Sequence, residues 1–522
     1  MSEIQAKFKP KDGLRVMLIR PYFEMLKHEL GFLPFEPLGL QYIQASLNNG
    51  GFITKLYDCL AEHAEKTFKV SGKNIFHCGS DERDIIKEVK KWRPDIVMIS
   101  GMFFAQSDSF LKTASLVKRV SPKIIVIGGG NFASLYYKKI LTESLDFDFI
   151  IIGDGEETAN ELLNNLNNFT KIPNVAYRDN QGKIAVIPPA NLKINIDDSL
   201  LPYRDFSKMY NYAKHVGYNY DELFYFKKFF KRLAVYKGLS FPGLRKLFAA
   251  IFNYKHRHGL KALFIPHACI STSRGCPNRC TFCAIHKFHR GLYRMRSTQS
   301  VLAEIDLLVS RGARSIIIVD DNFTVSKKRT IEICQGIIKR GYKIRLATPS
   351  GLYIPSLDRE TLECLFQAGL KDIPFAIENG DQEFLDKSIR KNLKLEQAKE
   401  IVKLAREIGF HTSGFFIFGY PGETKKTMLK TLRFAFESDF HHPRFFILQP
   451  FPGTEIFETA KRMGALKYFN YSRLKVITDE PQIETAEFSR QDVKKIFNLA
   501  YDILKKGNYN EVKNNLEKIL GW

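Results

Sequence analysis

The sequence predicts an α/β protein with a doubly wound parallel sheet, followed by a partial (β/α)6 barrel and a small C-terminal helical region. Two series of short apolar runs alternate with helix-length amphipathic stretches, over residues 14–166 and 267–454. A chain of 522 residues with 44% hydrophobic and 26% charged residues has room for two or three domains. We expect a sheet domain at 1–195, a linker with an insert at 196–266, a barrel at 267–475 and a helical region at 476–522.

The first series predicts five strand–helix units. The expected strands cover 14–19, 53–57, 95–100, 123–127 and 147–152, and the expected helices cover 38–49, 81–92, 107–120, 134–144 and 157–168. Such sheets bind ligands beyond the carboxyl ends of their strands. Glycines gather in the loops there, and they either let a backbone approach a bulky ligand or only close tight turns. The glycine-rich loops are Gly101-Met102-Phe103, Gly128-Gly129-Gly130-Asn131 and Gly153-Asp154-Gly155-Glu156.

The second series predicts strands at 315–319, 344–347, 372–377, 412–418 and 444–448, with helices such as 301–311 and 395–408. These units are too few for a complete eight-fold barrel, so a partial one is expected. The tail at 489–522 has apolar residues at helical spacing and is expected to pack as a cap.

Composition indicates a basic protein without a targeting segment. The 79 Lys and Arg against 56 Asp and Glu give a net charge of +23, which favours anionic partners. The N-terminus is polar, and no apolar run is long enough to span a bilayer. Outside one triplet, the eight cysteines are scattered, as is typical of a reducing compartment. A cytoplasmic location is therefore expected.

Residues 223–268 contain no Asp or Glu, and their Lys and Arg residues interleave with Phe and Leu. This pattern is typical of a helix at an anionic membrane surface, which would place the protein peripherally at the inner face of the membrane. It equally fits an ordinary helical insert that packs its Phe residues on the barrel. RNA binding is a weaker third option, and no nucleic-acid partner is expected.

Cys276, Cys280 and Cys283 form a C-x₃-C-x₂-C run on a loop punctuated by Gly and Pro. Iron–sulfur clusters are held by Cys thiolates, usually four. Three close ligands can hold three irons of a cubane and leave the fourth iron open to a small molecule. A structural zinc site would normally need a fourth Cys or His. Three unrelated buried thiols are the other alternative. Cys269 could act as a fourth ligand or a redox partner, but single cysteines are more often buried in a core, as expected for Cys334 and Cys364.

With its flanking motifs, the chain resembles the cobalamin-binding radical S-adenosylmethionine (SAM) family over nearly its whole length. The resemblance is carried by the cluster loop at 273–283, by strand ends at 320–323, 376–380, 414–424 and 449–454, and by 36–40, 92–97 and 153–158. One strand end alone could be a helix cap or a turn. Several in order, each after a predicted strand, occupy the positions where a βα barrel builds its active site.

The resemblance implies that Cys276, Cys280 and Cys283 hold a [4Fe–4S] cluster whose open iron binds SAM. It further implies cofactor contacts for Phe282, Asp320, Asp321, Glu378, Gly419 and Glu423, and for Gly101, Gly129, Gly130, Gly153, Gly155 and Glu156. The sequence departs from the family pattern at Asn379, where Ser is usual. The D-x-H-x-x-G loop that supplies a histidine to cobalt elsewhere is missing, since Arg20-Pro21-Tyr22-Phe23 follows the first strand; His28, His63 and His77 are not expected to replace it.

In function, the resemblance implies an enzyme that cleaves SAM to a 5′-deoxyadenosyl radical and, with cobalamin, methylates an unactivated carbon. We expect a small apolar substrate, such as a lipid or isoprenoid, and an electron donor such as flavodoxin or ferredoxin. Ring formation, oxidation or rearrangement with the same cofactors is the alternative. A methylthiotransferase acting on RNA should carry a second cysteine triplet, and the N-terminal half has only Cys59 and Cys78. An electron carrier without catalysis would want four ligands.

Overall fold

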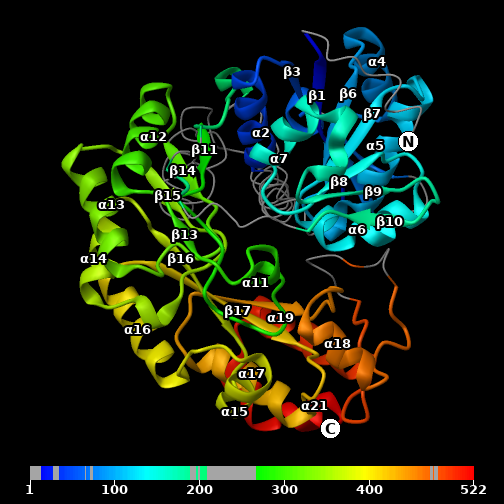
Figure 1. Cartoon of the computed structure of the whole chain (residues 1–522). Helices are drawn as coiled ribbons and strands as arrows, with labels where there is room; N and C mark the ends of the chain where they lie inside the picture. Colours follow the sequence, from blue (N-terminus) through cyan, green and yellow to red (C-terminus); the bar gives the residue numbers. More distant parts are fainter. Residues whose placement is uncertain are drawn as a thin grey trace, which may run out of the picture.

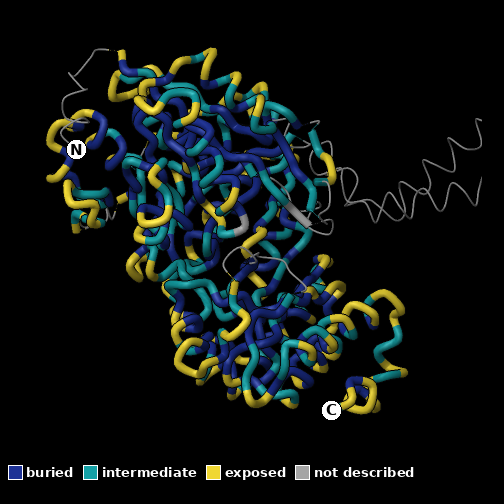
Figure 2. The backbone as a smooth tube through the Cα atoms, turned by 90° about the vertical axis from the view of Figure 1, so that its right-hand side faces the viewer, coloured by how far each residue is buried: buried dark blue, intermediate teal, exposed yellow. Residues whose placement is uncertain are grey.

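The computed structural model describes residues 13–26, 35–64, 66–70, 75–188, 195–197, 200–208, 266–470, 474 and 480–522. The predicted segment 223–268 therefore lies almost entirely outside the described residues. Buried residues run through the interior of the molecule, and exposed residues lie on loops and outer helix turns (Figure 2).

The N-terminal half contains the predicted doubly wound sheet (Figure 1). Five parallel strands lie in the order β3-β1-β6-β7-β8, and two antiparallel strands, β9 and β10, extend the sheet beyond β8. The strands are β1 (Arg15–Arg20), β3 (Ile53–Asp58), β6 (Ile96–Ser100), β7 (Ile125–Gly129), β8 (Phe149–Ile151), β9 (Val175–Arg178) and β10 (Ile184–Val186).

Helices cover both faces of this sheet. The core on one face takes side chains from α2 (Leu38–Asn49) and α7 (Glu156–Asn164). The other face packs against α4 (Glu82–Trp92), α5 (Ser107–Val120) and α6 (Asn131–Glu143). The bounds of α2 and α5 match the sequence prediction. The helix predicted at 157–168 ends early, since the chain continues as a 3₁₀ segment with a non-helical Asn168.

A small antiparallel sheet was missed by the sequence prediction, which had only a loop in the long connection after β3. It consists of β2 (Phe23–Leu26), β5 (Ile75–Cys78) and β4 (Thr67–Lys69), and a short helix, α3 (Cys59–Glu62), lies between β3 and β4 in the chain. Strands of three or four residues are too short to show an alternating pattern. Tyr22 packs its ring against His77 at 4.5 Å, which ties this sheet to the loop after β1.

The C-terminal half forms the predicted partial barrel (Figure 1). Two three-stranded parallel sheets, β11-β14-β15 and β16-β17-β18, are joined by a bridge between Leu346 and Leu370. The six strands are β11 (His267–Ile270), β14 (Ser315–Ile318), β15 (Arg345–Ala347), β16 (Asp372–Glu378), β17 (His411–Phe418) and β18 (His442–Ile447). Outer helices are α12 (Thr298–Ser310), α13 (Lys327–Lys339), α14 (Arg359–Gln367), α16 (Leu395–Ile408), α17 (Lys425–Glu437) and α18 (Glu455–Arg462).

The C-terminal tail closes the end of the barrel core. Its main helix, α19 (Arg490–Lys506), buries Val493, Ile496 and Ala500 in the same core as the barrel strands. The short helices α20 (Tyr509–Val512) and α21 (Leu516–Leu520) follow it. Within the part of the chain that the structure describes, no helix is both long and apolar enough to cross a bilayer.

A buried charge network, the linker network, joins the two halves. The Arg204 guanidinium lies between Glu36, which precedes α2, and Glu304 on α12, at 2.7 Å from the latter. It also donates to the Cys269 carbonyl of β11 at 2.6 Å, and Arg296 contacts the other oxygen of Glu304. These four charged side chains are almost fully buried, so the attraction of their ion-pair partners must offset the free-energy cost of removing each charge from water.

Replacing Arg204 by Met should destabilise the protein strongly, because Glu36 and the facing oxygen of Glu304 would stay buried without this cation. Removing one partner of a buried charge network costs about 3–5 kcal/mol. The loss in the free energy of unfolding is measured by urea denaturation followed by circular dichroism. The matched control is Lys387→Met, whose pair with Glu383 has both side chains 75% exposed; a cost below about 1 kcal/mol is expected there. Equal losses in the two variants would contradict this role.

Candidate functional site

The predicted cluster loop lies at the carboxyl end of β11. A two-residue strand, β12 (Ser273–Arg274), precedes the cysteines and pairs with β13 (Arg294–Met295), so that residues 275–293 form one hairpin. Cys280 is buried, Cys276 and Cys283 are half-buried, and all three are free thiols. The hairpin therefore presents the three sulfur atoms on one short loop.

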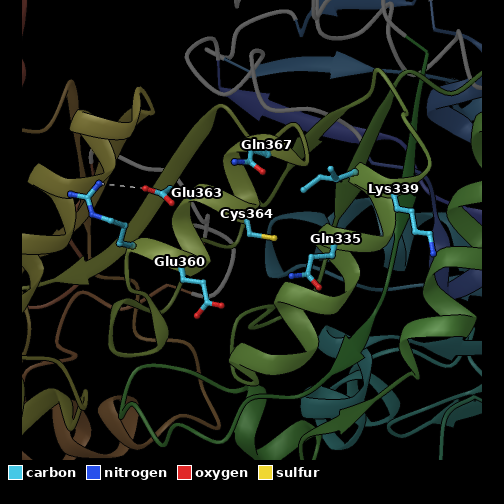
Figure 3. Close-up of a pocket in the computed structure, with 8 residues that line it drawn as sticks. Gln335, Lys339, Glu360, Glu363, Cys364 and Gln367 are labelled. Atoms are coloured by element: carbon cyan, nitrogen blue, oxygen red, sulfur yellow. Dashed lines mark hydrogen bonds and ion pairs between the residues drawn. The ribbon is translucent and has the colours of Figure 1, made fainter.

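The other cysteines lie elsewhere. Cys269 is buried against Leu38, Tyr42 and Ile317, and burial raises the pKa of its thiol. Cys334 is buried in the barrel core, as predicted. Cys364 is only partly buried and lines a surface pocket of about 650 Å³ between α13 and α14 (Figure 3). The sequence-predicted site residues do not line this pocket, which lies on the outer, helical side of the barrel.

Gly275 sets the conformation of the cluster loop. Its φ is +88°, and a Cβ at this position would lie 2.1 Å from the Leu292 carbonyl oxygen. Its N–H donates to Asp321 Oδ2 at 2.9 Å. Only glycine allows the two sides of the hairpin to approach this closely, just before the first cysteine.

Asp320, at the end of β14, holds the chain that leads into the cluster loop. Its carboxylate accepts the Thr272 N–H at 2.6 Å, the Thr272 hydroxyl at 2.5 Å and the Ser273 hydroxyl at 2.6 Å. Burial raises its pKa, and these donors oppose the shift. Both carboxylate oxygens are thus occupied by the protein, which indicates a positioning role for Asp320.

The two residues after Asp320 reach further toward the cysteines. Asp321 receives the Gly275 N–H and lies 3.5 Å from His289 Nε2; burial raises its pKa to about 6. Asn322 is buried, and its Nδ2 lies 3.7 Å from Cys276 Sγ. The Asn322 Oδ1 atom is buried without a hydrogen-bond partner within the described chain. This orphaned acceptor is of the kind that a bound group would satisfy.

Glu378 forms a buried ion pair that the sequence did not predict. It ends β16 at a register shift, with a positive φ of +74°, and its Oε1 lies 2.8 Å from Lys391 Nζ. Burial alone would lower the pKa of Lys391, but Glu378 and then the Cys280 thiol outweigh it and raise that pKa. Thr281 of the cluster loop bonds to the Ile389 and Ser388 carbonyls just before Lys391. The cation is therefore fixed next to the cysteines, although no local motif marks it.

Gly419 and Glu423 form a closed turn after β17. Glu423 Oε2 accepts the N–H groups of Gly419 and Tyr420 at 2.9 and 3.0 Å, and its Oε1 accepts Asn379 Nδ2 at 2.9 Å. Burial raises the pKa of Glu423 to about 7, and the same donors oppose the shift. Asn379, which departs from the family pattern, thus links the ends of β16 and β17. Both carboxylate oxygens of Glu423, like those of Asp320, accept hydrogen bonds from other groups of the protein.

An aromatic group lines the barrel interior beside this turn. Tyr420 is fully buried, its ring lies 6.1 Å from that of Phe282 on the cluster loop, and Phe384 lies 5.8 Å away on another side. The Tyr420 hydroxyl has no hydrogen-bond partner among the described residues. It is a second buried polar atom left unsatisfied by the protein near the cysteine loop.

The glycines of the N-terminal sheet fall into two groups. At Gly101 and Gly130 a Cβ would lie 2.9 Å from Phe110 and 2.7 Å from the Gly101 carbonyl, so both are required by local packing. At Gly155 it would lie 3.1 Å from Ile43. Gly129 meets nothing closer than 3.9 Å and Gly153 nothing within 4 Å. These two positions form an open rim along the carboxyl edge of the sheet, as a bulky ligand requires.

Glu156 turns toward the barrel rather than along this rim. With Asp154 it forms the interface clamp: Arg274 pairs with Glu156 at 2.5 Å and with Asp154 at 3.4 Å, and Arg294 pairs with Asp154 at 2.6 Å. Burial would raise the pKa of Asp154, but the two arginines outweigh it and lower that pKa. Both arginines flank the cysteine run, so the clamp joins the last rim loop of the sheet to the cluster hairpin.

A second contact brings the rim and the barrel mouth together. Phe104, which follows β6, stacks on Phe451 of the predicted 449–454 element at 4.8 Å. The short helix α11 (Ile285–Phe288) of the cluster hairpin lies next to α6 (Figure 1). The open glycine rim and the cluster hairpin thus lie at a common interface.

The loop after β1 is occupied by its own ion pair. Arg20 binds both carboxylate oxygens of Asp58, at the end of β3, at 2.7 and 2.6 Å. His77 is buried, with Nε2 3.1 Å from the carbonyls of Gly79 and Ser80, and His63 lies 3.7 Å from Asp84. His28 lies outside the described residues.

The residues present fit an iron–sulfur cubane with SAM and a corrinoid. The donor set is three thiols with buried, unsatisfied Asn322 and Tyr420 atoms nearby, and the rim leaves space at two glycines. Over the described ranges, no three His, Cys, Asp or Glu side chains gather around a single metal ion. The ligands of a cubane bind different irons, so their sulfurs stand further apart than those around one ion.

Both halves match known families. Residues 270–435 match the radical SAM superfamily, and residues 33–163 match the B12 binding domain. A cytidylyl-2-hydroxyethylphosphonate methyltransferase of Streptomyces wedmorensis is 29% identical over 467 residues, covering 86% of this chain and 82% of that protein. A hopanoid C-3 methylase of Methylococcus capsulatus is 24% identical over 454 residues, covering 86% and 73%.

A solved structure shares the fold. TsrM, a radical S-adenosylmethionine methyltransferase from Kitasatospora setae with cobalamin and a [4Fe–4S] cluster bound, superposes with a TM-score of 0.61. The match has 19% identity and covers 87% of this chain and 76% of that one. The order of the halves, with the corrinoid sheet before the barrel, is therefore that of a known architecture.

Replacing Gly275 by Ala should abolish cluster assembly, because the new Cβ would collide with the Leu292 carbonyl and open the hairpin. Iron content after anaerobic reconstitution measures the effect, and it should fall to a small fraction of wild type. Gly291→Ala is the matched control: its φ is also positive, at +72°, but no atom lies within 4 Å of the Cβ position. It should cost only the backbone strain of about 1–2 kcal/mol and retain the iron. Full iron in Gly275→Ala would refute the role of this contact.

Proposed function

The chain belongs to the cobalamin-binding radical SAM family, and on that premise we propose that it methylates an unactivated carbon of an apolar substrate, such as a lipid or isoprenoid. The observation that carries the proposal is the interface clamp. It holds the open rim of the corrinoid sheet against the hairpin that bears Cys276, Cys280 and Cys283.

We assign the three cysteines as ligands of the [4Fe–4S] cluster. When bound, the cluster supplies the electron that cleaves SAM, and cobalamin supplies a transferable methyl group. The buried Glu378–Lys391 pair offers one negative and one positive charge beside the cysteines. This pair matches the ammonium and carboxylate of an amino-acid group such as that of SAM. Asn322 and Tyr420 offer the unsatisfied polar atoms that would orient it.

The remaining motif residues act on the frame. Asp320 fixes the entry to the cluster loop, and Glu423 with Asn379 fixes the ends of β16 and β17. Gly129 and Gly153 leave the rim open for the corrin, and Phe104 with Phe451 closes one side of the interface against water. Excluding water protects a reactive radical from side reactions.

The relatives and the composition of the chain favour two different kinds of substrate. The relative named as a hopanoid methylase and the interleaved Phe and Lys of residues 223–268 favour an apolar substrate. The relative named for a cytidylyl phosphonate favours an anionic one, which a chain of net charge +23 would also attract. An anionic phosphonate-like substrate is the second candidate.

The first test is a reaction with methyl-labelled SAM and cobalamin in the anaerobically reconstituted enzyme. Wild type should hold about four irons per chain, form 5′-deoxyadenosine and transfer label to the substrate. Cys280→Ala should lose the cluster and all SAM cleavage. Cys364→Ala, at a partly buried cysteine outside the cluster loop, should keep both. SAM cleavage by Cys280→Ala would overturn the ligand assignment, and binding of no cobalamin would remove methyl transfer.

The membrane contact proposed for residues 223–268 rests on their sequence. Sedimentation with phosphatidylglycerol vesicles should be strong at low salt and weaken as salt rises, because screening reduces the attraction of lysines to anionic lipid. Replacing Phe226, Phe229 and Phe230 by Ser should abolish sedimentation and leave SAM cleavage intact. Equal recovery in the supernatant with and without vesicles would exclude membrane docking.

A further inference from the structure

Two cysteines on neighbouring helices lie in contact on the outer side of the barrel. Cys334 on α13 is fully buried, and Cys364 on α14 packs against the same core. The Cys364 sulfur lies 3.7 Å from the carbonyl oxygen of Ile331, which is one turn before Cys334 on α13. The Cys334 and Cys364 thiols are hydrogen-bond partners. The two sulfur atoms are therefore adjacent, although the residues are far apart in the chain.

The two thiols differ in access and in acidity. Cys364 lines the pocket between α13 and α14, and its side chain points from α14 toward Gln335 of α13 (Figure 3). The hydrogen bond with the Cys334 thiol lowers the pKa of Cys364, although burial and the charge of Glu360 oppose the shift. The same contact, together with burial, raises the pKa of Cys334. Because the thiolate is the nucleophile in cysteine chemistry, Cys364 is the thiol that reacts first with a molecule in the pocket.

The pocket suits a small molecule that carries negative charge. Its volume of about 650 Å³ lies in the range of small-molecule sites, and the exposed side chain of Ile338 gives it an apolar wall. The two acidic residues that line the pocket are both in ion pairs: Glu360 with Lys327, and Glu363 with Arg359. Lys339 is exposed at the same pocket, and no ion pair of the described residues includes it. An anionic molecule would therefore meet a cation beside the Cys364 sulfur.

We propose that Cys334 and Cys364 form a thiol–disulfide exchange site whose pocket takes a small anionic disulfide, such as oxidised glutathione. The Cys364 sulfur attacks one sulfur of this molecule, a mixed disulfide forms, and the other half leaves as a thiolate. Cys334 then attacks the Cys364 sulfur, forms a disulfide between α13 and α14, and releases the second half.

The exchange is balanced without a further reactant. The two protein thiols are oxidised to one disulfide, the bound disulfide is reduced to two thiols, and the two protein thiol protons pass to the released thiolates. The inference goes beyond the proposed function and does not depend on it, because neither cysteine belongs to the cluster loop.

The test maps disulfides in the anaerobically reconstituted full chain after incubation with oxidised glutathione. Remaining thiols are alkylated in denaturant, and tryptic peptides are identified by mass spectrometry. Cys334 and Cys364 are the sole cysteines of the tryptic peptides 330–339 and 360–371, so a disulfide between them gives one cross-linked mass. Wild type should give this cross-link, and dithiothreitol should reverse it. Cys59, which is equally buried, is the internal control and should stay reduced.

Single variants separate the two steps. Cys334→Ser keeps a hydrogen-bond donor beside Cys364 and should stop at one glutathione bound to Cys364. Cys364→Ser should carry no glutathione at Cys334, because that thiol is buried. Reduced Cys364 in both wild type and Cys334→Ser would overturn the site. A mixed disulfide that persists in wild type without the cross-link would overturn Cys334 as the second thiol.

A charge reversal tests the choice of ligand. In the Cys334→Ser background, Lys339→Glu should slow glutathione uptake about threefold or more at low salt, and should leave the uptake of uncharged hydroxyethyl disulfide unchanged. Lys403→Glu, at an exposed lysine on α16, changes the net charge equally and should leave both rates unchanged. Equal rates of glutathione uptake with and without Lys339→Glu would overturn the anionic disulfide as the occupant of the pocket.

Discussion

The interface clamp is the constraint on which the site depends. Asp154 and Glu156 stand on the last rim loop of the sheet, and Arg274 and Arg294 stand on the two strands of the cluster hairpin. Charges that are removed from water need ion-pair partners, so the two carboxylates and the two arginines would each be destabilised without the other pair. The distance between the corrinoid rim and the cysteines is thus set by side chains that are far apart in sequence, and Phe104 on Phe451 gives the same interface an apolar contact.

Carboxylates at the strand ends serve two different purposes. Asp320 and Glu423 have every oxygen engaged by backbone or side-chain donors of the protein. Glu378 has a single cation, Lys391, and a backbone bent out of register. The sequence motifs mark all three positions alike, because a motif reports that a residue type is needed and not which neighbour needs it. Only the hydrogen bonds in the structure distinguish carboxylates that position the strand ends from carboxylates that are available to contact a bound molecule.

Much of the fold could be predicted from periodicity and strand–helix alternation, and the bounds of α2, α5 and α16 match the predictions. The small sheet of β2, β4 and β5 could not, because its strands are too short to show a period. Lys391 and Arg204 could not either: each is a lone cation whose partners lie far along the chain, and nothing local marks such a pair. The assigned roles of the cysteines and glycines stay predictions, although their placement is consistent with them. Open space surrounds the Cβ position of Gly153, where a φ of +82° requires glycine, whereas close packing against Phe110 requires glycine at Gly101, so glycines in similar loops can have different reasons.

The Arg20–Asp58 pair has a consequence for how this protein could have diverged. Asp58 is 1% exposed and both of its oxygens bind the Arg20 side chain at the point where other corrinoid sheets place a histidine loop. A lineage that exchanged Arg20 for histidine in one step would leave a buried carboxylate without its cation, at a cost of about 3–5 kcal/mol. Such a loss is a large share of the stability of a natural protein. Residues 20 and 58 are therefore expected to change together or not at all. A single nucleotide change at residue 20 would not easily restore a histidine loop in this protein.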